Sequence, residues 1–153
     1  MRNVFFLAVA ALVATVSARA AGQAPVTTTD GLSCFENLAA PEFPPAALHA
    51  HVDGSVWTWT QVNAQGVPEK TDTQVVSAWS DGARLLTPPV EKAIHAAKIK
   101  PSCAGKKVWV VFRYALHGDA TANPKTTSRT DGPNVMWIES QPAKAVESAA
   151  AKH

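Results

Sequence analysis

Hydrophobic and polar residues alternate along two segments of the chain, and a segment between them has a helical period. Residues 55–62 read SVWTWTQV and residues 107–116 read KVWVVFRYAL, so aromatic or β-branched side chains recur at every second position. A period of two predicts β-strands, because successive side chains point to opposite faces of a sheet. A further strand is predicted around 71–79, after a turn at 63–66 that contains asparagine and glycine.

Two helices are predicted beside these strands. One apolar stripe has members at i, i+3, i+4 and i+7, namely Val90, Ala93, Ile94 and Ala97. A shorter helix fits FPPAAL at 43–48, because proline is tolerated in a first turn. Together these periods predict an α+β fold of two layers, in which a three-stranded antiparallel sheet carries helices on one face.

The first 20 residues have the organisation of a secretory signal peptide. Arg2 supplies the positive start, residues 4–16 are almost wholly apolar, and Ala18, Arg19 and Ala20 form a small-x-small cleavage site. An uncleaved membrane anchor is the alternative, but Arg19 ends the apolar run short of the roughly 20 residues that span a bilayer. We therefore expect cleavage after Ala20, export, and no stable membrane span in the mature chain.

The rest of the chain divides by composition into three parts. Residues 21–31 are small and polar and are expected to form a flexible leader, and residues 32–116 form the folded domain. Residues 117–153 form a polar tail with one apolar run, NVMWIE at 134–139, and a disordered end. If this run pairs with the strand at 107–116, it adds a C-terminal edge strand and covers the edge that a partner would need.

The chain has two cysteines, Cys34 and Cys103. In an exported protein a single disulfide is the simplest interpretation, and closing so long a loop stabilises the fold by about 4 kcal/mol. A metal pair or a redox thiol is the alternative, but the spacing is not CxxC and no histidine stands near either cysteine.

Charge and side-chain chemistry narrow the function further. A formal net charge of +2 is too small and too scattered for a nucleic-acid surface. His49 and His51 form one HxH pair, which is half of a metal coordination shell. Since no serine stands in a nucleophile-elbow context, we expect neither an enzyme nor a bound cofactor or metal.

Several short motifs resemble, in their order and spacing, the C-terminal domain of TonB-type energy transducers. They cover residues 41–116 and comprise FPPAAL at 43–48, DGSV at 53–56, GV at 66–67, AKIKP at 97–101 and GKKV at 105–108. The resemblance implies a periplasmic protein-binding module of a Gram-negative bacterium, accessory to TonB-dependent outer-membrane transport. It also implies that a receptor segment adds as a β-strand to an exposed edge, which by position is the strand at 107–116.

The chain departs from that family in three respects. It shows no transmembrane anchor followed by a long proline-rich spacer, so we expect no force transmission by this chain alone. Ala97 stands where the family often has an aromatic residue, and the expected disulfide is not part of the general pattern. The tail after 116 is a further difference.

The resemblance turns the tryptophans of two strands away from the helices. It predicts a partner-binding surface made of Trp57, Trp59, Trp109, Val111 and Arg113. In the alternative arrangement the tryptophans are core and the threonines between them face solvent, or the tail covers the patch. A second functional hypothesis follows from the same surface, namely a structural envelope protein that forms homodimers and has no transport role.

Overall fold

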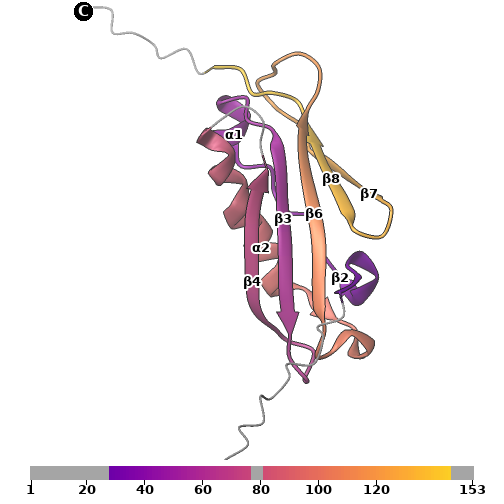
Figure 1. Cartoon of the computed structure of the whole chain (residues 1–153). Coiled ribbons are helices and arrows are strands. Elements are labelled where there is room, and N and C mark those ends of the chain that lie inside the picture. The colour runs from indigo at the N-terminus through magenta and orange to yellow at the C-terminus, as the bar shows by residue number, and fades with distance from the viewer. Residues whose placement is uncertain (1–27, 77–80, 146–153) are drawn as a thin grey trace, which may run out of the picture.

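The computed structural model describes residues 28–76 and 81–145 and has an α+β fold, in which a mostly antiparallel sheet carries helices on one face (Figure 1). In sheet order the strands are β4 (Pro68–Val76), β3 (Gly54–Val62), β6 (Lys107–Leu116), β8 (Val135–Ser140) and β7 (Thr127–Asp131). A short strand, β1 (Thr28–Asp30), pairs with β6 off this path. The predicted signal peptide, most of the predicted leader and residues 77–79 of the predicted second strand lie outside the described residues.

β3, β4 and β6 are the three antiparallel strands that the alternation predicted. β3 pairs with β4 on one side and with β6 on the other. The hairpin between β3 and β4 turns where expected, and the Asn63 side chain holds it, because its Oδ1 accepts the backbone N–H groups of Gln65 and Val67 at 3.0 and 2.8 Å. β4 begins earlier than predicted, at Pro68, because the turn closes within Asn63 to Val67.

The helices cover one face of the sheet. α1 (Pro45–His49) begins at the second residue of the proline pair and buries Ala47 and Leu48. α2 (Thr87–Ala96) lies behind β4 in Figure 1, and its predicted stripe supplies the buried Val90, Ala93 and Ile94. Ala97, the last predicted member of the stripe, is already extended, and the chain continues into β5 (Lys98–Ile99).

Three short 3₁₀ helices complete the helical segments, namely η1 (Leu32–Cys34), η2 (Asp81–Leu86) and η3 (Pro101–Cys103). η1 and η3 carry the two cysteines, which form the predicted disulfide with their Cα atoms 5.6 Å apart. Beside it, β2 (Phe35–Asn37) pairs with β5 in a separate two-stranded sheet. This corner therefore ties the beginning of the domain to the loop that precedes β6.

The predicted three-stranded sheet was too small, because segments before and after the predicted strands join it. Thr28–Asp30, predicted to lie in a flexible leader, pair in parallel with Lys107 to Trp109 of β6. The apolar run of the tail forms β8, which pairs in parallel with Val111 to Leu116. β8 is not the edge strand that the sequence suggested, because β7 pairs along its other side.

The core lies between the sheet and the helices. Alternate residues of β3 and β6 point into it, among them Val56, Val62, Val110 and Phe112, all at most 1 % exposed. Thr58 and Thr60 are equally buried, and Thr58 Oγ1 donates to the Val110 carbonyl oxygen at 3.0 Å. The arrangement with tryptophans in the core and threonines in solvent is therefore wrong.

Candidate functional site

The face of the sheet opposite the helices carries the tryptophans. On β3 and β6 most residues that alternate with the core positions are partly or fully exposed, and they include Trp57, Trp59 and Trp109. The strand register places Val135 and Trp137 of β8 beside them. We call the surface formed by these residues and by Val111 and Arg113 the tryptophan face.

Three of these tryptophans form one cluster. The ring centroid of Trp57 lies 6.2 Å from that of Trp59 and 6.0 Å from that of Trp109, with the ring planes tilted by 42° and 33°. In the strand register Trp59 lies directly opposite Trp109, and Trp57 lies opposite Val111. Such aromatic contacts restrain the rings, and restrained side chains lose less conformational entropy when a surface is buried.

A stack of two arginines and one tryptophan adjoins this cluster. The guanidinium carbons of Arg113 on β6 and Arg129 on β7 lie 5.1 and 4.8 Å from the ring centroid of Trp137 on β8. The Trp137 Nε1–H donates to Asp131 Oδ2 at 3.3 Å, which orients the ring. Three neighbouring strands thus present alternating cationic and aromatic groups in a row.

The structure brings the five predicted binding residues onto one face, but it changes the role of one. Val111 is only 3 % exposed, because it lies between Trp57 on β3 and Val135 on β8. It therefore supports the tryptophans from below and offers little contact area of its own. Arg113 is exposed, as a binding residue needs to be.

Sequence reasoning missed Trp137 and Arg129. The alternation within 134–139 is a local signal that could have placed Trp137 on one face of a strand. No local signal places Arg129 beside it, because their contact depends on the pairing of β7 with β8, where the two residues lie directly opposite.

The resemblance implied that the edge of β6 is exposed, but in the structure this edge is occupied. The strands β1 and β8 occupy it in succession, and between them the Val111 N–H donates to the Asn134 carbonyl oxygen at 2.8 Å. The tail therefore covers the edge at which strand addition was expected. It leaves the tryptophan face uncovered in the part of the chain that the structure describes.

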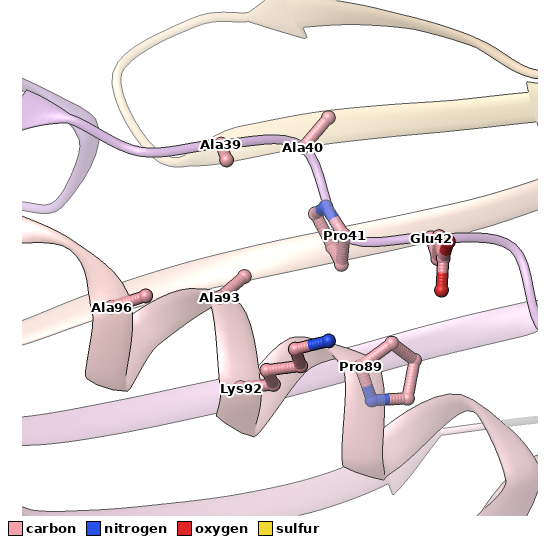
Figure 2. Close-up of a pocket in the computed structure, with 8 residues that line it drawn as sticks. All are labelled: Ala39, Ala40, Pro41, Glu42, Pro89, Lys92, Ala93 and Ala96. Atoms are coloured by element: carbon pink, nitrogen blue, oxygen red, sulfur yellow. The ribbon is translucent and has the colours of Figure 1, made fainter.

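A shallow depression on the helix side is a weaker candidate site. It lies between the extended segment 39–42 and α2 (Figure 2) and is lined by Ala39, Ala40, Pro41, Glu42, Pro89, Lys92, Ala93 and Ala96. Its volume of about 200 Å³ is below the roughly 300 Å³ at which pockets for small ligands begin. Glu42 and Lys92 are its only charged residues, so it offers little chemistry.

His51 of the HxH pair makes a structural contact. His51 lies two residues after the end of α1, and its Nε2 lies 3.3 Å from the Ala143 carbonyl oxygen, a contact between the tail and the end of the helix. Neither His49 nor His51 belongs to a group of three potential metal ligands within 28–76 and 81–145. In the same residues no helix is both long and apolar enough to cross a bilayer.

Comparison of the chain with protein-family models, with curated proteins and with solved structures finds no significant match.

Proposed function

We propose that this chain is an exported, periplasmic protein-binding module of the TonB C-terminal type, accessory to TonB-dependent outer-membrane transport, and that its partner docks on the tryptophan face. The motifs at 43–48, 53–56, 66–67, 97–101 and 105–108 motivate the family. The observation that carries the docking site is the partly exposed cluster of Trp57, Trp59 and Trp109. Tryptophans in such clusters are the residues that most often dominate binding energy at protein interfaces.

Docking on the face fits the structure better than strand addition at β6. Adding a strand there requires that the partner displace β8, which pairs with β6 over six residues, or β1, which pairs over three. The outer edges of β4 and β7 carry mostly polar and charged side chains, the usual protection of an edge against pairing. Side-chain docking on the face leaves all these hydrogen bonds in place.

Export is supported from two directions. Residues 1–20 have the charge and apolar pattern of a signal peptide. The disulfide between Cys34 and Cys103 belongs to the type of bond that persists in oxidising compartments.

Site-specific photo-crosslinking in whole cells tests the proposal. A photoreactive residue replaces Gln74 of β4, which lies opposite Trp57, and in a separate strain it replaces Lys92 of α2 on the helix side. We expect position 74, and not position 92, to capture an outer-membrane receptor or another envelope protein. Crosslinking from position 92 alone would contradict the docking site.

Substitutions on the tryptophan face test the docking site through the crosslinking yield. Trp57→Ser or Trp59→Ser should lower the crosslinking yield at least tenfold, because each removes a large apolar anchor. Val67→Ser is the matched control, since Val67 is 53 % exposed but lies in the hairpin turn away from the face. Thermal unfolding of each variant checks that the fold is retained. If position 74 captures only second copies of this chain, the result would favour the alternative hypothesis of a self-associating structural envelope protein over the transport module.

A further inference from the structure

We draw no further inference here: the strongest candidate, the outer edge of β4 with its exposed Lys70 and Asp72, carries nothing, because the strand pairing is irregular beside Lys70 and nothing in the structure shows what covers this edge.

Discussion

The backbone N–H of Gly31 donates a hydrogen bond to the side-chain oxygen Oδ1 of Asn134 at 3.1 Å, across 103 residues of sequence. The contact lies where β1 ends and β8 begins, beside the middle of β6. The neighbouring Leu32 N–H donates to the Pro133 carbonyl oxygen at 2.8 Å. This junction joins the two segments that cover the edge of β6 and leaves the tryptophan face as the available surface of the sheet.

Replacement of Gly31 by alanine should lower the free energy of unfolding by about 3 kcal/mol. Gly31 has a φ of −61°, which any residue can adopt, but a Cβ at this position would overlap the Trp109 carbonyl oxygen. Gly105→Ala is the control, because it strains the backbone without a steric overlap: Gly105 has a φ of +73° and open space around it. This change should lower the free energy of unfolding by about 1 kcal/mol. Urea denaturation followed by tryptophan fluorescence measures both, and equal losses would contradict the steric explanation.

Asn134→Ala should lower the free energy of unfolding by about 1–3 kcal/mol, because it leaves the buried Gly31 N–H without an acceptor. Hydrogen exchange should also accelerate at the Val111 amide, which bonds to the backbone of Asn134. The exposed Asn123 provides the control, and Asn123→Ala should stay within about 0.5 kcal/mol of the natural chain. Unchanged exchange at Val111 would show that the junction does not hold β8 on β6.

Reduction of the disulfide, or the double change Cys34→Ala and Cys103→Ala, should destabilise the protein by about 2–4 kcal/mol. The bond closes a loop with a sequence separation of 69, and its two cysteines are 1 % and 6 % exposed. Calorimetry with and without reductant measures the effect, and the double variant should no longer respond to reductant. A melting temperature that is the same in all samples would contradict this structural role.

Tyr114→Phe should leave the stability unchanged or raise it by about 1 kcal/mol. Tyr114 is 2 % exposed and its ring packs edge-on against Phe43 at a centroid distance of 5.1 Å, while its hydroxyl has no hydrogen-bond partner among the described residues. Phenylalanine keeps the ring contact and removes the unsatisfied group. Chemical denaturation measures the change, and a loss of more than 1 kcal/mol would reveal a partner for the hydroxyl.

The same residue predicts an alkaline dependence of stability. Burial raises the pKa of the Tyr114 phenol above its ordinary value of 10.0, so the folded state keeps the proton that the unfolded state releases. The contribution of Tyr114 to the free energy of unfolding is constant below pH 10. Above pH 10 it falls by about 1.4 kcal/mol for each pH unit. Since the chain has one tyrosine, phenolate absorbance should appear only as the protein unfolds. Phenolate absorbance from the folded protein near pH 10 would refute the shift.

The central elements could be predicted because their signals are local. The alternation fixes which residues within β3, and which within β6, share a face, whatever the rest of the chain does, so Trp57 and Trp59 were placed together correctly. The same holds for Val90, Ala93 and Ile94 of α2. That Trp109 joins Trp57 and Trp59 depends on the register of β6 on β3. The side of β3 that faces the helices is not a local property, because both of its faces carry residues typical of strands.

The remaining part of the candidate site could not be predicted in this way. The contacts of Arg113 and Arg129 with Trp137 require the register of β8 on β6 and of β7 on β8, which depends on residues far apart in sequence. The three residues of β1 also could not be predicted, because TTD is too short and too polar to indicate a strand. They form a strand because they pair with β6.

Residue order alone was enough to predict the order of the main strands and helices, the two faces of β3 and β6, and the one available pair of cysteines. These follow from side-chain periodicity and from counting. Long-range packing decided that a segment near each end of the described chain meets the other at Gly31 and Asn134, and that both occupy the edge of β6. The reason is physical: backbone groups along a strand edge pair with whichever segment packing brings alongside, and their hydrogen bonds carry no sequence code of their own.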